Sequence, residues 1–266
     1  MNNYHTHTYR CRHASGEVFE YAQAAIDAGL SELGISDHVP FPDGEWAASR
    51  MDISELPVYL QAIADARDSS AERLRILSGF ECEWRADMHE YLKDLSQTHS
   101  VDYLVAGVHW FPFEGDWFPS TRIERSGELL AFTEYTVKTI ESGLFSFLAH
   151  PDVFCAAWPV WNRDSVACAR AILEAAADRR LPLEINGYGL RKPYVSTADG
   201  YRPQYPYIGF WELAAEYDIE AIVNSDAHRP MDVAAGLEEG RELAARFGIP
   251  VLETLNQTPN HAVSRP

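Results

Sequence analysis

The sequence predicts an α/β fold in which mostly parallel strands close into a barrel. Short apolar runs alternate seven times with segments of helical periodicity, almost from one end of the chain to the other, and such alternation is typical of parallel sheets. Polar residues follow every predicted strand. An open doubly wound sheet would gather them at one switch point and usually has a glycine-rich first turn, which this chain lacks. We therefore expect a barrel with its site at the carboxyl ends of the strands.

The elements can be placed in order along the chain. The first strand holds His5 and His7, which project to the same side because alternate strand residues do so. Six further strands are expected over residues 33–38, 75–83, 102–109, 145–150, 181–186 and 219–225. Helices are expected over residues 16–28, 54–70, 88–98, 126–142, 163–179, 208–217 and 231–247.

Apolar spacing supports these helices. The helix over 16–28 carries Val18, Tyr21, Ala22 and Ala25 on one face, and Gly29 ends it. Three connections are expected to be loops: a proline-rich stretch over 39–49, an aromatic-rich stretch over 110–118, and a tyrosine- and proline-rich stretch after residue 186. Residues 250–252 and a polar tail follow the last helix.

Length and composition narrow the class of protein. At 266 residues, with 46% hydrophobic residues, the chain is expected to form one domain over 1–266, since single α/β barrels have around 250 residues. The net charge of −18 repels nucleic acid and anionic membranes, so neither is expected as a partner. Four cysteines form no Cys-x-x-Cys, and we expect neither a leader nor a membrane span, since no apolar run of the required length occurs in the sequence. We therefore expect a cytoplasmic protein with reduced thiols.

The predicted strand ends share one property, namely that almost all carry a residue able to bind a metal. These residues are His5 and His7, Asp37 and His38, Glu81 with Glu83, His109, His150 and Asp152, and Asp226 and His228, with His13 just beyond the first strand. Strand six ends in Glu184 and Asn186, which we rank as poorer ligands. Histidine and carboxylate sites without thiolate suit Zn, Mn or Fe in a catalytic role.

Each of these residues also has a simpler interpretation. A lone strand-end histidine is more often a hydrogen-bonded polar residue than a ligand, Asp226 could cap the next helix, and Glu81 could pair with an arginine. Seven histidines at one rim are harder to explain without a metal, because buried and unpartnered they would be costly. His89, His99 and His261 are expected to be plain surface residues, and Cys11 and Cys82 packing thiols.

The same residues resemble the polymerase and histidinol phosphatase (PHP) superfamily, and within it the histidinol-phosphate phosphatases. The matching stretches are HTHTYRCRHASG (5–16), ISDHVPF (35–41), GFECEW (79–84), GVH (107–109), AHPD (149–152), EINGYGLRK (184–192) and NSDAH (224–228). They occur in order over nearly the whole chain. The resemblance implies a distorted (β/α)7 TIM-like barrel of the PHP type with a trinuclear metal centre.

The resemblance also implies three sets of ligands, which share one bridging residue. The first metal would be bound by His5, His7, Glu81 and Asp226, the second by Glu81, His109 and His150, and the third by His13, His38 and His228. Glu81 would therefore bridge the first two metals. All nine of these residues are present, so an inactive copy of the family is not expected.

The expected activity is metal-dependent hydrolysis of a phosphate monoester. A water shared between the ions that Glu81 bridges would lose a proton and attack phosphorus in line. Asp226 or His228 would handle the proton of the leaving group. Arg191 is the first candidate for a phosphate clamp and Lys192 the second, because an arginine fork matches two phosphate oxygens. A surface salt bridge is the other interpretation of Arg191.

On the resemblance, the substrate is L-histidinol phosphate, which would place the chain in histidine biosynthesis. Gly187-Tyr188-Gly189 and the aromatic stretch over 110–118 depart from many relatives. They leave a different small phosphate ester as the alternative. The aromatic rings could stack on a flat substrate group or form a lid that packs on itself. The oligomeric state stays open.

Three other classes of protein fit the sequence less well. A nuclease is disfavoured by the acidity and by the lack of a basic groove. Many metal-dependent amidohydrolases bridge their metals through a carboxylated lysine, but Lys93 and Lys138 fall in predicted helices. A metal-binding or regulatory barrel without turnover would bind metal and hydrolyse no ester.

Overall fold

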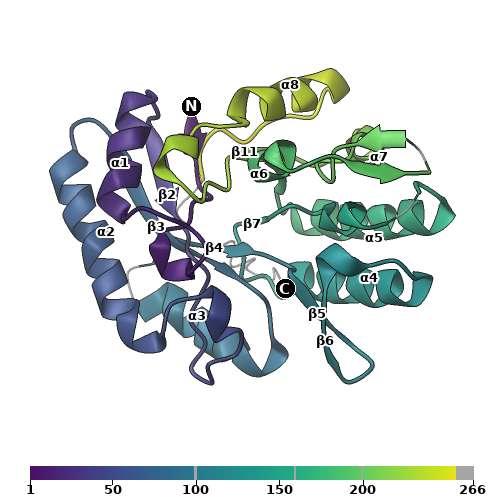
Figure 1. Ribbon diagram of the computed structural model, residues 1–266, viewed down its shortest axis with the longest axis horizontal. Coiled ribbons are helices and arrows are strands. Elements are labelled where there is room, and N and C mark those ends of the chain that lie inside the picture. The colour runs from purple at the N-terminus through teal and green to yellow at the C-terminus, as the bar shows by residue number, and fades with distance from the viewer. Residues whose placement is uncertain (99–100, 159, 199, 256–266) are drawn as a thin grey trace, which may run out of the picture.

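Seven parallel strands form one sheet that curls into a nearly closed barrel (Figure 1). The computed structural model describes residues 1–98, 101–158, 160–198 and 200–255. In sheet order, the strands are β1 (Asn2–Asn3), β2 (Glu32–Ile35), β3 (Arg75–Cys82), β4 (Tyr103–Ala106), β7 (Phe147–Leu148), β8 (Leu183–Asn186) and β11 (Ala221–Asn224). The two edges meet through a parallel bridge between Thr6 and Ala227. The α/β barrel predicted from the alternation of elements is thereby confirmed.

Helices cover the outside of the strands (Figure 1). They are α1 (Val18–Asp27), α2 (Leu56–Ser70), α3 (His89–Thr98), α4 (Ser126–Glu141), α5 (Arg163–Arg179), α6 (Gly187–Arg191), α7 (Ile208–Ala214) and α8 (Leu237–Phe247). Side-chain caps fix several of their starts: Glu17 forms a capping box with Glu20 at α1, and Asn162 caps α5. Among the described residues, no helix combines the length and apolar character needed to cross a membrane.

The strands alternate between two apolar layers, as period-2 side chains require. Outward residues such as Ile76, Phe80 and Leu104 pack beneath the helices. A smaller inner cluster fills the barrel with Tyr4, Leu77, Tyr103, Val105, Phe147, Ala149, Ile222 and Leu255. Glu81 shares the inward face of β3 with Leu77 and Gly79, four and two residues away. Its side chain therefore points into the barrel, between the inner apolar cluster and the rim formed by the carboxyl ends of the strands.

Element bounds differ from the prediction where local chemistry overrides periodicity. The last helix does not begin at residue 231, because a 3₁₀ turn (Pro230–Asp232) and Gly236, with φ 84°, precede α8. The first strand is only two residues long, although Thr6 continues its pairing through the bridge to Ala227. His99 and His261, expected to lie on the surface, are outside the described residues.

Two expected loops contain hairpins. The aromatic stretch forms β5 (Trp110–Phe113) and β6 (Asp116–Pro119), with Phe113 paired to Asp116. The turn residues Glu114 and Gly115 both have positive φ, as a two-residue hairpin of type I′ requires. The stretch after residue 186 contains α6 and a second hairpin, β9 (Val195–Thr197) with β10 (Gly200–Arg202).

Gly79 leaves space for the Tyr103 ring inside the barrel. A Cβ at residue 79 would lie 2.4 Å from Cζ of Tyr103. We expect Gly79→Ala to lower the free energy of unfolding by about 1–3 kcal/mol, because this ring is held on all sides and cannot move away. Denaturant unfolding followed by circular dichroism would measure it. Gly127→Ala in α4, where the nearest atom is 4.0 Å away, is the matched control and should be neutral or slightly stabilising. Equal stabilities of the two variants would contradict this packing.

Candidate metal centre

The buried Glu81 carboxylate lies at the centre of a ring of imidazoles. One oxygen, Oε2, is 3.3 Å from His5 Nε2, 3.4 Å from His7 Nε2 and 3.2 Å from His38 Nδ1. The other, Oε1, is 3.3 Å from His109 Nε2 and 3.2 Å from His150 Nε2. Five histidines from the ends of four strands thus face the two oxygens of one carboxylate.

Asp226 provides a second carboxylate on the same side. Its Oδ1 lies 3.3 Å from His7 Nε2, 3.6 Å from His5 Nε2 and 3.4 Å from His228 Nδ1. Asp226 and His150 both have positive φ, 47° and 31°, which is uncommon for residues other than glycine. Strained backbone of this kind is frequent where a fold must aim a side chain.

His13 reaches the cluster from the turn after the first strand. The Asp37 carboxylate accepts hydrogen bonds from the Thr8 amide at 2.8 Å and the Thr8 hydroxyl at 2.6 Å, which fixes the start of this turn. His13 Nδ1 is 2.7 Å from the Cys11 carbonyl. The His13 ring then lies 5.4 Å from that of His38 and 4.9 Å from that of His228, centre to centre. All nine sequence-predicted ligands therefore gather at one rim.

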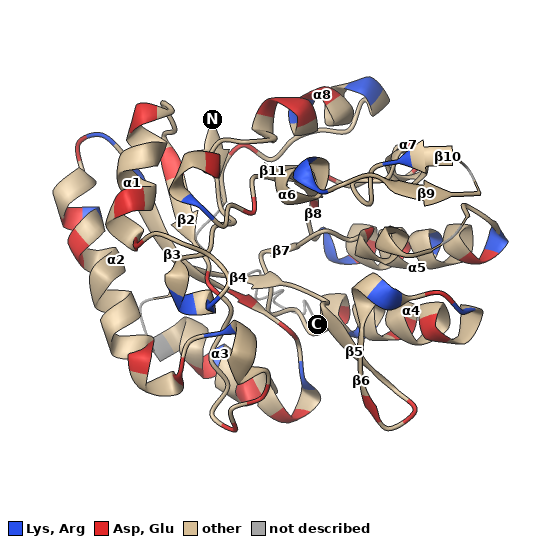
Figure 2. Ribbon diagram, in the orientation of Figure 1, with Lys and Arg blue, Asp and Glu red and all other residues tan. Residues whose placement is uncertain are grey.

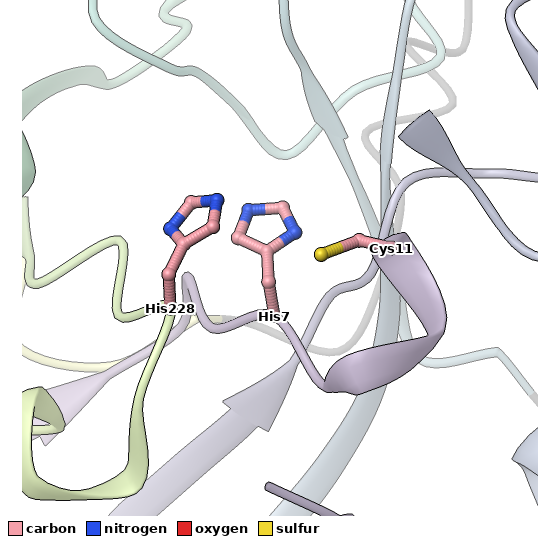
Figure 3. A group of neighbouring side chains, drawn as sticks. All are labelled: His7, Cys11 and His228. Atoms are coloured by element: carbon pink, nitrogen blue, oxygen red, sulfur yellow. The ribbon is translucent and has the colours of Figure 1, made fainter. Parts of the chain in front are cut away.

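Three smaller sets of ligand atoms lie within 4.8 Å of one another in the described part of the chain. They are His5, His7 and Glu81; His38, Glu81 and His109; and His7, Cys11 and His228. Figure 3 shows the last set, with the His7 ring between His228 and the Cys11 thiol. Cys11 thus faces the side of His7 turned away from His228. Burial raises the pKa of Cys11 to about 12, so it stays a neutral thiol, which agrees with the predicted packing role.

Two further carboxylates lie behind the ligand histidines. Glu184 Oε1 is 2.8 Å from His5 Nδ1, and Glu83 Oε1 is 2.9 Å from His109 Nδ1. A carboxylate can only accept a proton at such a contact, so both Nδ1 atoms carry hydrogen. The Nε2 atoms of the same two rings, those of His5 and His109, then point at Glu81. This is the arrangement that holds metal-binding histidines in one tautomer.

Sequence reasoning ranked Glu184 as a poor ligand and missed this second role. Asn224 and Asn186 each donate to the Glu184 carboxylate, at 3.0 and 2.8 Å, and Asn186 also donates to Asp226 at 3.1 Å. The available signal was the alternation in Glu184-Ile185-Asn186, which places both polar side chains on the inward face of β8. Asp152, by contrast, turns away and accepts from the Tyr207 amide and the Trp211 indole.

The donor set fits a bound cation. With hydrogen on the Nδ1 atoms of His5 and His109, their neutral rings would turn nitrogen lone pairs toward the lone pairs of Glu81, at 3.3 Å each. Asp226 Oδ1 and His38 Nδ1 are also buried without a hydrogen-bond partner. Lone pairs that face each other repel, and a buried polar atom without a partner is costly. A proton or a metal ion between the atoms would relieve both.

Burial and neighbouring charge divide these histidines into two groups. Burial, aided by His228, lowers the pKa of His7 to about 3, and burial also lowers the pKa values of His13 and His38. Burial opposes charge on His5 and His109 as well, but nearby carboxylates outweigh it and raise their pKa values. The lowered pKa values favour the neutral, metal-binding form of the first group, whereas the raised pKa values favour the protonated form of the second.

The two candidate phosphate-binding residues lie beside this cluster, on and just after α6. Arg191 donates to the carbonyls of Ala235 at 2.8 Å and Ser225 at 3.1 Å, which engages only part of its five N–H donors. The Lys192 ammonium lies 4.9 Å from the ring centres of both Tyr188 and Tyr205. Tyr188 in turn stacks on His228 at 4.8 Å.

Charge elsewhere on the molecule is spread out. Acidic residues occur on the outer helices α1, α2, α4 and α8 (Figure 2).

His89, expected to lie on the surface, is half-buried, with the Trp84 indole donating to its ring at 3.4 Å.

Metal binding should release protons. The raised pKa values of His5 and His109 keep these rings protonated to a higher pH than free imidazoles, and a metal ligand must be deprotonated. Affinity should therefore fall as the pH drops below these pKa values, whereas His7, with a pKa of about 3, adds nothing above about pH 4. Calorimetry of Zn²⁺ binding in buffers with different ionisation enthalpies would count the protons. A heat that is independent of the buffer would contradict this charge state.

Known proteins share this arrangement in sequence and in fold. The PHP domain pattern matches residues 3–187. The "probable histidinol-phosphatase" of Deinococcus radiodurans is 31% identical over 251 residues, which cover 91% of this chain and 93% of that protein. A phosphatase homologue of Caldanaerobacter subterraneus is 26% identical over 258 residues, covering 95% of this chain and 85% of that one.

A solved structure has the same fold. The histidinol phosphate phosphatase of Lactococcus lactis, crystallised with zinc, L-histidinol and phosphate, superposes with a TM-score of 0.77 at 16% identity and covers 96% of this chain and 97% of its own. The match to the PHP domain over more than half of the chain and the relative above 30% identity agree with the cluster of histidines and carboxylates. The chain belongs to the PHP domain family and is a phosphoesterase of that family.

Proposed function

We propose that this protein hydrolyses a small phosphate monoester, L-histidinol phosphate, at a centre of three divalent metal ions. The observation that carries the proposal is the Glu81 carboxylate, whose two oxygens face separate groups of imidazoles at 3.2–3.4 Å. One carboxylate placed between two groups of imidazole nitrogens is suited to bridge two cations.

The ligand sets are those that the family resemblance implies, and the neighbours of Glu81 and Asp226 support the first two. His5, His7, Glu81 and Asp226 would bind the first ion, and Glu81, His109 and His150 the second. The third ion would be bound by His13, His38 and His228. It is supported by the clustering of their rings and by the tautomers of His13 and His228, whose Nδ1 atoms contact backbone carbonyls. Zinc, manganese and iron all suit this donor set.

When bound, such ions would lower the pKa of water toward neutrality and offset the charge on the phosphoryl oxygens. The protein's own residues would do the rest. Lys192 and Arg191 supply positive charge beside Asp226, and Lys192 is the more available of the two because Arg191 already binds two carbonyls. The leaving alkoxide also needs a proton, and His228 or Asp226 would relay to it the proton lost by the attacking water.

The choice of substrate rests on the relatives. The Deinococcus homologue is named for histidinol phosphate, and the Lactococcus structure holds L-histidinol and phosphate. Tyr188, stacked on His228, offers a flat surface near the site that suits an imidazole ring. A different small phosphate ester remains the alternative, since other relatives are named only as phosphatases.

Phosphate release from a panel of monoesters would test the proposal. The purified protein, loaded with Zn²⁺ or Mn²⁺, should hydrolyse L-histidinol phosphate with the highest kcat/KM of the panel. Much faster hydrolysis of another ester would favour the alternative substrate. Metal binding without release from any ester would overturn the proposed activity and leave a metal-binding barrel.

Glu81→Gln tests the bridging role. The amide removes one charge and half of the acceptor capacity between the ligand sets, so we expect the loss of two ions per chain and a fall in kcat of about 10³-fold or more. Elemental analysis and phosphate release would measure the two effects. Glu128→Gln, a buried carboxylate that caps α4, is the matched control and should keep both. Retained turnover in the Glu81 variant would rule out bridging.

Lys192→Met tests the phosphate contact. A hydrogen bond to a charged group contributes about 1.5–3 kcal/mol, so KM should rise about 10- to 100-fold with metal content unchanged. Lys138→Met, an exposed lysine of α4, is the control.

Arg191→Ala tests the other candidate phosphate contact. It should raise KM by a larger factor than that by which it lowers the metal content. A variant with wild-type KM would remove its residue from the substrate site.

A further inference from the structure

Arg50 is an arginine buried in the interior without a role in the reaction described so far. It is 1% exposed and among the largest fully buried side chains of the described residues. Its guanidinium donates to the Val39 carbonyl at 2.8 Å and to Glu83 Oε2 at 3.0 Å, and its Nε donates to the Trp46 carbonyl at 3.4 Å. Burying a cation is costly unless its partners fix it in place, so this position is strongly determined by its contacts.

The contacts lead from Arg50 to the metal centre in two steps. Glu83 uses Oε2 for Arg50 and Oε1 for His109 Nδ1, at 3.0 and 2.9 Å. The other nitrogen of His109, Nε2, faces Glu81 Oε1 at 3.3 Å. We propose that Arg50 is a positioning residue of the metal centre: it holds Glu83 so that the His109 ring stays aimed at the ion shared with Glu81. This inference rests on the metal centre of the proposed function.

An arginine suits this place because its fork reaches two directions at once. Val39 directly follows the ligand His38, whereas Glu83 lies two residues after the ligand Glu81. One guanidinium therefore ties together the chain segments after β2 and β3, each of which carries a ligand. A lysine would supply the charge but not the fixed geometry of two simultaneous contacts.

Aromatic rings surround the Arg50 guanidinium and connect it to the hairpin that follows His109. The Arg50 guanidinium carbon lies 5.2 Å from the Phe41 ring centre and 5.1 Å from that of Trp46. Trp46 contacts Trp110 at 6.4 Å and Trp117 at 4.9 Å, and these two belong to the hairpin that directly follows His109. The hairpin thus packs on the residue that holds Arg50, which screens the Arg50–Glu83 pair from water and strengthens it.

Metal affinity measures this role independently of the substrate. Apparent Zn²⁺ affinity would be determined by chelator competition for wild type, Glu83→Gln, Arg50→Met and the double variant. Loss of a partner behind a ligand histidine typically weakens metal binding 10- to 100-fold. We expect Glu83→Gln and Arg50→Met each to fall in this range. Because Arg50 acts through Glu83, the double variant should be no weaker than Glu83→Gln alone.

Arg67 provides a matched control. It also donates to one carbonyl, Ile76 at 2.9 Å, and to one carboxylate, Asp102 at 2.7 Å, but Asp102 precedes β4 instead of following it. Arg67→Met should leave Zn²⁺ affinity unchanged. In the cobalt(II)-loaded protein, the visible absorption of the metal should shift alike in Arg50→Met and Glu83→Gln and should stay constant in Arg67→Met.

The outcomes separate this inference from the proposed function. Wild-type Zn²⁺ affinity in Glu83→Gln, or additive losses in the double variant, would overturn the positioning role and leave the metal centre intact. No stoichiometric Zn²⁺ binding by the wild-type protein would overturn the metal centre itself. Should Arg50→Met not fold, the double variant decides, since it leaves no uncompensated buried charge. A Zn²⁺ affinity of the double variant well below that of Glu83→Gln would then contradict the proposal that Arg50 acts through Glu83.

Discussion

The site depends on one electrostatic constraint, the burial of Glu81 among five imidazoles. Two of those imidazoles, His5 and His109, are held by carboxylates on the far side of the ring, so their remaining nitrogens must face Glu81. Neutral nitrogens and carboxylate oxygens at 3.3 Å repel each other without a cation between them. In the metal-free protein, a proton on His5 or His109 can take that place, because the neighbouring carboxylates outweigh the effect of burial and raise the pKa values of these two rings. A divalent ion would replace the proton and take the full set of ligands.

The barrel fixes the positions of Glu81 and the imidazoles around it. Six of the seven strands bring candidate ligands to the rim at or just after their carboxyl ends, β8 being the exception, and the inner apolar cluster around Tyr103 and Phe147 closes the barrel below them. Ligand positions are further fixed by polar groups just outside the cluster. Asp37 ties down Thr8, Asn186 and Asn224 hold Glu184, and Arg50 holds Glu83. The second set of contacts is as extensive as the first, which is the usual design of metal sites.

The gathering of the candidate ligands at one rim could be predicted from the sequence because strand periodicity is local. His5 and His7 lie two residues apart and must share a face, and parallel strands must end at the same rim. Their partners could not be predicted, because Glu184 reaches His5 and Glu83 reaches His109 through pairings that depend on sheet register. Arg50 lies in a loop, where no periodicity points to burial. The hairpin of β5 and β6 was predicted as a loop; Pro112 disfavours a strand interior, although Glu114-Gly115 fits a tight turn.

The central claim is that this rim holds several divalent ions at once. Elemental analysis of protein purified without chelator, before and after the ions are stripped and restored, tests it most directly. Close to three ions per chain, with phosphate release lost on stripping and regained on restoring them, is the result expected from this geometry. Full turnover by the stripped protein, or at most one ion per chain under saturating metal, would contradict it.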